Sequence, residues 1–442
     1  MVQGGTKMFV SNYVSSLSIL NVMNKHASAM AKHMSHIATG SRIASVAEDP
    51  SGWAIGMRMS VQIRGLDQAN RNAQQYKSML KVADGGVSST VDILRTLKEK
   101  AIEAANDTCT DSDRQTIQKL FNQYADQIDD NALITYNGKY LINGSHNTAS
   151  KLTNQAYTNS SLSTDTTTDT KLTDLLRRNG DSLNILADDT VNVSYVKDGK
   201  TYTTSYKVEN TTVKDIFTKA NAIDTAVFDV DNMSDTNEIG VDETGRTVKT
   251  VDDKNALTIK AKTAGTDGAV SGFTISITDK NGQVKKNANS SLDAFTEKIQ
   301  PRNENSGDML YAQVGTKSNQ GIKLGLGDMT SLGLGLRSKD GDVLNVTTRD
   351  GANAAISVLD NALNRALDQQ TTIGAVSSRM DYTIQNLTTQ SENTTAAMST
   401  LMDANLAKEM VEYTKENILL QAAQAMLAQN NKNAAWFLSL LQ

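Results

Sequence analysis

The residue types that most often carry chemistry are scarce in this sequence of 442 residues, which has four histidines and one cysteine. His26, His33 and His36 lie in one segment, where helical spacing would bring His26 and His33 to the same face. Such a face could bind a metal ion or exchange protons. No cysteine or acidic residue is interleaved among them, so we interpret the segment as a polar helix face and predict no metal site.

Catalytic motifs are missing from the sequence. It contains neither the H-E-x-x-H of zinc proteases nor the G-x-S-x-G of serine hydrolases. Cys109 stands in a polar turn without a neighbouring histidine or lysine to activate it, and an ordinary turn residue is the simpler interpretation. We therefore predict that the chain is not an enzyme and has no catalytic residue, metal or cofactor.

The composition of the chain limits the kinds of partner that it is expected to bind. Hydrophobic residues make up 38% of the chain and aromatic residues 5%, which favours long two-sided helices over one large core. The net charge is −5 and no run of Lys or Arg stands out, so nucleic acid and anionic membranes are not expected partners. No apolar run could span a bilayer and no cleavable secretory signal is visible. Composition alone predicts a cytoplasmic protein.

The longest predicted element is a helix from Trp53 to Ala105. Its apolar residues recur in alternating steps of three and four, which keeps one stripe of the helix against a partner. A helix of this length is about 75 Å long, so it must lie along other long helices. Gly85 and Gly86 are expected to loosen it. For packing within the subunit we select Leu66, Ala73, Leu80, Val87, Leu94 and Leu97, with Ile373 and Ile384 from the far end of the chain.

Helical spacing also marks both ends of the chain. A first helix is predicted over residues 10–37, and helical spacing returns at 352 and continues to 441. Ser112 with Gln115 resembles a capping box that begins a further helix, and Asn137-Gly138 between β-branched and aromatic residues predicts a hairpin. The simplest packing pairs the helices of the two ends.

The middle of the chain differs from both ends. Thr, Asp, Asn and Ser dominate from about Ser145, and the segments 191–196, 202–208 and 273–278 are predicted strands near Asp-Gly and Asn-Gly turns. Short helices are predicted over 213–223 and 292–299. The fold class is therefore mainly α with an α+β insert: long antiparallel coiled-coil-like helices from both termini, small β-hairpins and a separate domain.

Two stretches near the N-terminus carry a family resemblance. Residues 36–55, HIATGSRIASVAEDPSGWAI, and residues 63–73, IRGLDQANRNA, are similar to the N-terminal region of bacterial flagellin. Residues 313–315, 331–334, 373–380, 427–429 and 439–441 match its C-terminal region in the same order. The resemblance covers roughly residues 8–145 and 308–442, whereas 146–307 corresponds to the part that varies within the family.

The resemblance implies a subunit that polymerises into the extracellular flagellar filament for motility. It also implies type III export, which supplies a route for a chain without a signal peptide. The implied partners are copies of the chain itself, an export chaperone, the filament cap and hook-associated proteins. The implied division of the chain is an N-terminal assembly helix, disordered in the monomer (1–45), helical core (46–145), a variable outer domain (146–307), helical core (308–400) and a C-terminal assembly helix (401–442).

The functional residues of such a protein are its interface residues. For contacts between subunits we select Val14, Leu17, Met30, Met34, Leu406, Met410, Leu420, Leu427 and Leu440. An animal innate receptor reads flagellins at a segment that corresponds here to Leu94, Arg95, Thr96, Glu99 and Ala101. Thr96 replaces the family's arginine, and a hydroxyl cannot reproduce the two-pronged hydrogen bonding of a guanidinium. Weakened receptor recognition is therefore expected.

Two alternatives stay open at the level of sequence. A hook–filament junction protein shares both terminal regions but ends a stack of subunits instead of propagating it. A filament subunit whose outer domain acts as an adhesin is the second alternative, and an exposed aromatic cluster in the insert would support it. The sparse Tyr202, Tyr206, Phe217 and Phe273 look more like ordinary core residues.

Overall fold

The computed structural model describes residues 12–223 and 227–440 and divides the chain into two compact units. The first unit contains Met1–Arg71, Val314–Gln320 and Thr383–Gln442, and the second contains Asn72–Gln313 and Gly321–Tyr382. Each unit therefore combines segments from both halves of the chain, as expected if helices from the two ends pair. Among the described residues, no helix is long and apolar enough to cross a membrane.

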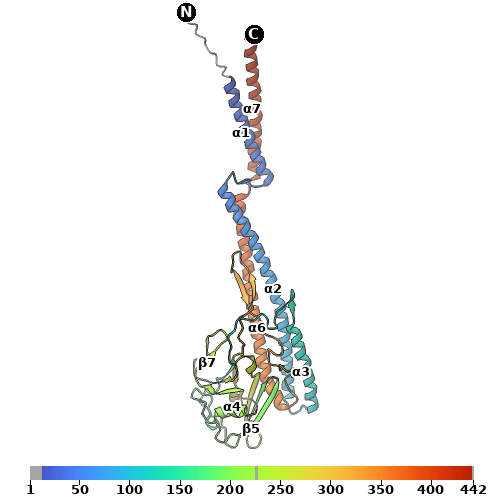
Figure 1. Cartoon of the computed structure of the whole chain (residues 1–442), viewed down its shortest axis with the longest axis vertical. Helices are drawn as coiled ribbons and strands as arrows, with labels where there is room; N and C mark the ends of the chain where they lie inside the picture. Colours follow the sequence, from blue (N-terminus) through green and yellow to red (C-terminus); the bar gives the residue numbers. More distant parts are fainter. Residues whose placement is uncertain (1–11, 224–226, 441–442) are drawn as a thin grey trace. The chain divides into compact units, whose positions relative to one another are not determined.

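Helices dominate both ends of the chain (Figure 1). They are α1 (Asn12–Thr39), α2 (Pro50–Ala104), α3 (Asp111–Ala132), α4 (Val213–Asn221), α5 (Lys286–Leu292), α6 (Arg349–Met402) and α7 (Leu406–Leu440). Two short 3-10 turns lie at Leu172–Asp174 and Thr266–Gly268. Pro50 occupies the first position of α2, where a missing N–H costs no helical hydrogen bond.

The start of α3 corrects one prediction. The capping box joins Thr110 and Asp113, not Ser112 and Gln115. The N–H of Asp113 donates to Thr110 Oγ1 at 3.3 Å, and the N–H of Thr110 donates to Asp113 Oδ2 at 3.0 Å. Both candidate pairs have the same spacing, and the turn that precedes the helix decides which residue adopts the extended backbone that a cap requires.

Short antiparallel strands form the β-rich middle of the chain. They are β1 (Thr135–Tyr136), β2 (Lys139–Tyr140), β3 (Ala156–Asn159), β4 (Thr190–Lys197), β5 (Lys200–Lys207), β6 (Phe228–Ser234), β7 (Glu238–Val241), β8 (Thr247–Lys249), β9 (Leu257–Ala261), β10 (Gly272–Thr278), β11 (Phe295–Ile299), β12 (Leu310–Gln313) and β13 (Gly321–Leu324). The larger sheets have the orders β10-β4-β5 and β11-β3-β9-β6. With the long helices, this arrangement confirms the predicted fold class.

Two hairpins follow the turn chemistry that predicted them. Asn137 and Gly138 have φ values of 51° and 76° between β1 and β2, and Asp198 and Gly199 have 47° and 67° between β4 and β5. Positive φ at both central residues is the geometry that matches the twist of the paired strands. Helix α4 likewise lies where a short helix was predicted.

The segment 292–299 is a second correction, because a helix was predicted there. Helix α5 ends at Leu292, and β11 pairs antiparallel with β3. Along β11, Phe295, Glu297 and Ile299 lie further inside than Thr296 and Lys298. A spacing of two over five residues is too short to be distinguished from one helical turn by sequence, and the pairing with β3 decides the outcome.

Aromatic rings form the core between the two larger sheets, β10-β4-β5 and β11-β3-β9-β6, which are called the outer sheets below. Phe217 on α4 contacts Phe228 on β6 at 5.2 Å between centroids, and Phe273 on β10 contacts Tyr157 on β3 at 5.1 Å, both edge-on. Edge-on packing adds a favourable electrostatic contribution to the burial of the rings. Tyr202 and Tyr206 are half-buried, and Phe217 and Phe273 are buried.

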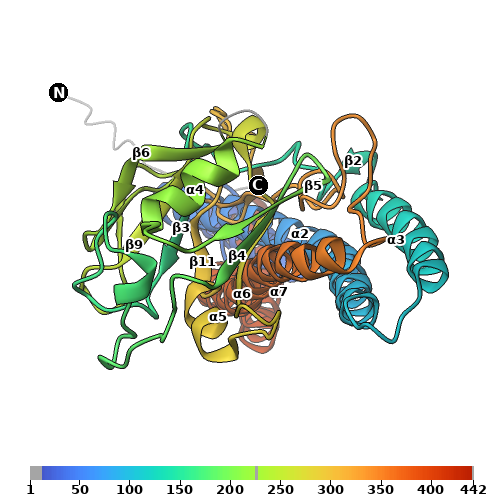
Figure 2. The same cartoon turned by 90° about the horizontal axis from the view of Figure 1, so that it is seen from below.

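In the second unit, α2 and α6 run antiparallel. Lys77 pairs with Asp381, and Lys98 pairs with Asp360, so the two ion pairs lie 21 residues apart on both helices. This spacing equals three heptads, the repeat of helices that wrap around each other. Figure 2 shows α3 on one side of these two helices and the outer sheets on the other.

Gly85 and Gly86 sit inside α2, which continues through both. A Cβ on Gly86 would come within 2.9 Å of Ile134 Cδ1 and 3.0 Å of Ile142 Cδ1, whereas a Cβ on Gly85 would meet nothing within 4 Å. Gly86 therefore marks the place where the residues just before and just after the hairpin β1–β2 approach the helix closely.

These neighbouring glycines provide a matched test. Gly86→Leu is expected to lower the free energy of unfolding by about 1–3 kcal/mol, because the added side chain forces Ile134 and Ile142 apart. Gly85→Leu is expected to be neutral or to raise it by up to about 1 kcal/mol through better helix propensity. Urea unfolding of the full chain measures both, and equal effects at the two positions would contradict the close approach.

Candidate assembly surfaces

Helices α1 and α7 of the first unit pack side by side (Figure 1). Among the residues of each helix that lie further inside, one set recurs in alternating steps of three and four. It contains Ser16, Ile19, Met23, His26, Met30, His33 and Ile37 on α1, and Glu409, Tyr413, Glu416, Leu420, Ala423, Leu427 and Asn430 on α7. This alternation over three heptads defines a coiled-coil seam in which several positions are polar.

Polar side chains of α1 pair with polar side chains of α7 across the seam. His26 Nδ1 lies 2.6 Å from Glu416 Oε2, and His33 Nδ1 lies 2.6 Å from Glu409 Oε2. The two pairs are seven residues apart on both helices, which specifies an antiparallel register. Near the other end, Asn430 donates to Ser16 Oγ at 2.8 Å.

The loop after α1 places a further carboxylate, that of Glu48, next to His36. Glu48 accepts hydrogen bonds from the N–H of Ala44 at 2.9 Å and from His36 Nε2 at 3.0 Å. Burial by itself would raise the pKa of Glu48, but these two donors hold it below its ordinary value of 4.5. The hydrogen bond from His33 similarly lowers the pKa of Glu409, with partial burial opposing and His36 assisting.

The seam differs from the apolar stripe expected from the sequence. Of the residues selected from the sequence on the first helix, Val14, Leu17 and Met34 are exposed, with Val14 showing 73% of its surface. Leu406 and Met410 on α7 are exposed as well. Met30, Leu420 and Leu427 are half-buried in the seam, and the side chain of Leu440 lies outside the described residues. The two helices thus keep large apolar side chains open on faces that α1–α7 pairing does not cover.

The residues selected for packing within the subunit lie mostly inside. Seven are buried, at no more than 3% exposure, and Ile384 is half-buried: Leu66, Ala73, Leu80, Val87, Leu94, Leu97 and Ile373 make up the seven. In the receptor-like segment, Leu94 and Ala101 are buried, Thr96 is half-buried, and Arg95 and Glu99 are exposed. Only part of that segment is therefore accessible in the folded unit.

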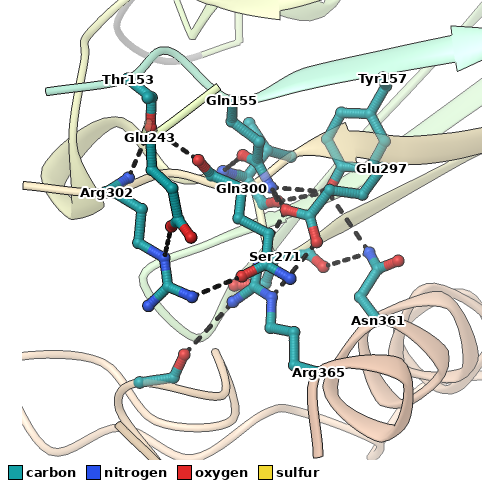
Figure 3. A network of polar contacts seen from close by, with 12 residues as sticks. Thr153, Gln155, Tyr157, Glu243, Ser271, Glu297, Gln300, Arg302, Asn361 and Arg365 are labelled. Carbon is teal, nitrogen blue, oxygen red and sulfur yellow. Dashed lines mark hydrogen bonds and ion pairs between the residues drawn. The ribbon is translucent and has the colours of Figure 1, made fainter. Parts of the chain in front are cut away.

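A buried polar network joins α6 to the outer sheets (Figure 3). Arg365 on α6 donates to both carboxylate oxygens of Glu297 on β11, at 2.6 and 3.2 Å. Gln155 donates to Glu297 Oε1 at 2.5 Å. The side chains of Glu297 and Arg365 are 7% and 14% exposed, so this ion pair lies in a poorly hydrated environment where breaking it is costly.

Tyr157 extends the network. Burial raises the pKa of Tyr157 well above 10, so its hydroxyl stays protonated and donates to the carbonyl of Val270 at 2.7 Å. Asn361 on α6 donates to the carbonyl of Ser271 at 2.9 Å and to the Tyr157 hydroxyl at 3.3 Å. This network of Glu297, Arg365, Gln155, Tyr157 and Asn361 is called the joint below. Sequence reasoning missed it, because nothing in the spacing of Glu297 and Arg365 marks them as partners.

Together these features define a class of protein. The chain pairs helices from its two ends, leaves apolar helix faces uncovered and holds a β-rich region against α6 through a buried polar network. The arrangement is typical of a structural subunit that assembles with copies of itself.

Comparison with known proteins identifies the family. Residues 10–148 match the bacterial flagellin N-terminal helical region, and residues 356–441 match the bacterial flagellin C-terminal helical region. A flagellin of Clostridium tyrobutyricum is 28% identical, over 96% of this chain and 99% of the relative, and a flagellin of Bacillus subtilis (strain 168) is 26% identical, over 98% and 100%. The chain belongs to the bacterial flagellin family.

Among solved structures, a flagellar hook associated protein-3 from Legionella pneumophila is similar, with 12% sequence identity and a TM-score of 0.34, covering 78% of this chain and 98% of that one. Family membership confirms the predicted function: the chain is a subunit of the extracellular flagellar filament, a structural and non-enzymatic protein of motility.

The joint leads to a stability prediction. Arg365→Met leaves the Glu297 carboxylate buried with Gln155 as its remaining side-chain donor, and we expect a loss of about 3–5 kcal/mol in the stability of the second unit. Arg349→Met on the same helix is the control, because that side chain is 55% exposed and its loss should cost less than about 1 kcal/mol. Urea unfolding measures both, and similar losses would contradict the role of the joint.

The seam carboxylates lead to a pH prediction. A carboxyl whose pKa is lower when folded stabilises the fold above its unfolded pKa, and this contribution is lost as the pH falls through the folded value. We therefore expect hydrogen-exchange protection of α1 and α7, measured in the assembled form where both helices are ordered, to fall below about pH 4.5 because Glu48 and Glu409 become protonated. Glu409→Gln should flatten this dependence, whereas Glu412→Gln should not, since Glu412 pairs with Lys415 on its own helix. A pH response that is unchanged in Glu409→Gln would refute the assignment.

Proposed function

We propose that the filament is built through the uncovered faces of α1 and α7. The interface residues proposed are those selected from the sequence: Val14, Leu17, Met30, Met34, Leu406, Met410, Leu420, Leu427 and Leu440. The observation that supports this most is the exposure of five of them, Val14, Leu17, Met34, Leu406 and Met410, in the single chain. Exposed apolar side chains gathered on two paired helices favour burial against another protein surface.

Contacts made by α1 and α7 would also explain why subunits add to an open filament and do not close into a ring. A contact in which one surface of a subunit meets a different surface of the next makes a filament when the rotation does not close into a ring. We propose that residues 1–45 and 401–442 are the assembly segments and that 46–145 and 308–400 form the core. In this proposal the assembly segments are disordered in the monomer, because their seams bury little apolar surface against the cost of ordering the chain.

The partners beyond the filament itself belong to the same proposal. Polymerisation follows from the family. An export chaperone would cover the open apolar faces before assembly, and the filament cap and hook-associated proteins would meet them at the two ends of the filament. Type III export would deliver the chain. An innate receptor would find Arg95 and Glu99 exposed in the receptor-like segment, with Thr96 weakening the contact.

The outer domain, residues 146–307, is proposed to face away from these assembly segments. The adhesin alternative depends on an exposed aromatic cluster, whereas the aromatic side chains that contact one another around Phe217 are buried or half-buried. We therefore propose a solvated outer domain without a dedicated binding surface built from aromatic residues.

Seeded growth tests the assembly faces. Monomer with sonicated filament fragments is followed by negative-stain microscopy for the unaltered chain, for a chain lacking residues 1–37 and 401–442, and for Leu17→Gln and Met410→Gln. Removing a side chain of this size from an interface costs about 1.5–3 kcal/mol, so each substitution should slow elongation about tenfold or more. The trimmed chain should not elongate.

The matched control changes an exposed apolar residue of the outer domain. Val251 is 92% exposed, and Val251→Gln should elongate like the unaltered chain. Elongation of Leu17→Gln and Met410→Gln at the control rate would reject the proposed faces. Growth of the unaltered chain that stops after a short ring would instead support the hook–filament junction alternative.

A further inference from the structure

Three groups that commonly bind metal ions meet in the first unit. His33 and His36 are three residues apart on α1, and Glu409 faces them from α7. His33 Nδ1 lies 2.6 Å and His36 Nδ1 3.4 Å from Glu409 Oε2, and one ligand atom of each residue lies within 4.8 Å of the others. Two imidazoles and one carboxylate are a ligand set that binds zinc in proteins.

His36 is oriented as a metal ligand. Its side chain is buried, with 5% of the residue exposed, and its Nε2 lies 3.0 and 3.1 Å from the two oxygens of Glu48. Because an ionised carboxylate only accepts hydrogen bonds, Nε2 is the ring nitrogen that donates to Glu48, and metal binding would use the lone pair that a neutral ring then carries on Nδ1. Nδ1 has no hydrogen-bond partner among the described residues and faces the carboxylate of Glu409.

The surroundings of Glu48 support this orientation. A carboxylate on the far nitrogen of a ligating histidine fixes the ring and raises its basicity, as in many zinc sites. Glu48 is itself held by the N–H of Ala44 at 2.9 Å, and Lys32 Nζ lies 3.6 Å from its Oε1. The second shell that a metal site needs is therefore already built into the loop after α1.

We propose that His33, His36 and Glu409 bind one divalent transition-metal ion, Zn²⁺ by their ligand class, with water completing the coordination. Bonds of about 2.0–2.1 Å in a tetrahedral site place ligand atoms about 3.3 Å apart. Here Glu409 Oε2 lies 2.6 Å from His33 Nδ1 and 3.4 Å from His36 Nδ1, and all three ligand atoms lie within 4.8 Å of one another, so small side-chain movements would complete the site. The ion takes the place of the proton between His33 Nδ1 and Glu409, and that proton is released to solvent.

The bound ion links α1 to α7 and stabilises their pairing. A ligand that binds only the paired helices shifts the equilibrium toward them by mass action. This inference concerns the single chain and does not rest on the proposed assembly faces. The structure also provides an internal control: His26 pairs with Glu416 at the same distance of 2.6 Å, seven residues from His33, without being part of the three-residue cluster.

Calorimetric titration of ZnCl₂ into the full chain tests the site, both as monomer and as filament. Cys109→Ser and His146→Ala are introduced throughout to remove the cysteine and the distant histidine. One Zn²⁺ per chain is expected. His33→Ala and His36→Ala should each weaken binding at least a hundredfold, Glu48→Gln tenfold to a hundredfold, and His26→Ala less than threefold.

Co²⁺ provides a second readout in the chain with unaltered ligands, because its visible absorption bands distinguish four-coordinate nitrogen and oxygen ligation. Hydrogen exchange identifies any variant that fails to pair α1 with α7. Where a variant fails to pair them, the Co²⁺ spectrum of the chain with unaltered ligands decides: bands of four-coordinate nitrogen and oxygen ligation support the site, and their absence overturns it. The proposal is overturned if neither form binds Zn²⁺ one to one. It is also overturned if His33→Ala and His36→Ala bind like His26→Ala, as expected when His36 is a cation between two carboxylates.

Discussion

The structure depends on the inability of a long amphipathic helix to bury its own apolar stripe. Helices α2 and α6 have 55 and 54 residues and are far longer than the helices of ordinary globular domains. One compact core cannot cover the apolar stripe of so long a helix along its whole length. Each must lie along another helix, and the chain meets this need by returning from its middle so that the two halves run antiparallel. Lys77–Asp381 and Lys98–Asp360, three heptads apart, show that this pairing keeps one register through the second unit.

The two helix pairs meet this constraint with different chemistry. The part of α2 in the second unit buries Leu80, Val87, Leu94 and Leu97, and apolar burial is the main source of its stability. The α1–α7 seam instead contains His26, His33 and their glutamates, which specify register at the expense of apolar contact. A seam of this kind stabilises a pair modestly and leaves larger apolar residues, among them Val14 and Met410, exposed on its open faces.

The β-rich middle of the chain depends on a separate constraint, the attachment of small sheets to a helix. Arg365 and Asn361 on α6 provide directional hydrogen bonds to β11 and to the chain before β10, where apolar contact alone would leave orientation loosely specified. A buried ion pair of this kind contributes little net stability over an apolar replacement, but separating its two partners is costly. The joint therefore acts mainly by keeping the domain in one arrangement on its helix.

The sequence alone determined the elements with strong local signals. Period-3.6 stripes predicted the long helices, Asn137-Gly138 and Asp198-Gly199 predicted hairpins, and the absence of catalytic motifs pointed to a structural role. The tertiary structure decided what depends on partners distant in the chain. It determined that 295–299 is a strand, that α1 turns Ile19 and its histidines toward α7 while Val14 and Leu17 stay open, and that Glu297 meets Arg365. It also brought His33 and His36 to Glu409, more than 370 residues away. Local spacing specifies a helix and its possible faces, but the face that is buried is chosen by the free energy of packing against the partner, which the spacing does not contain.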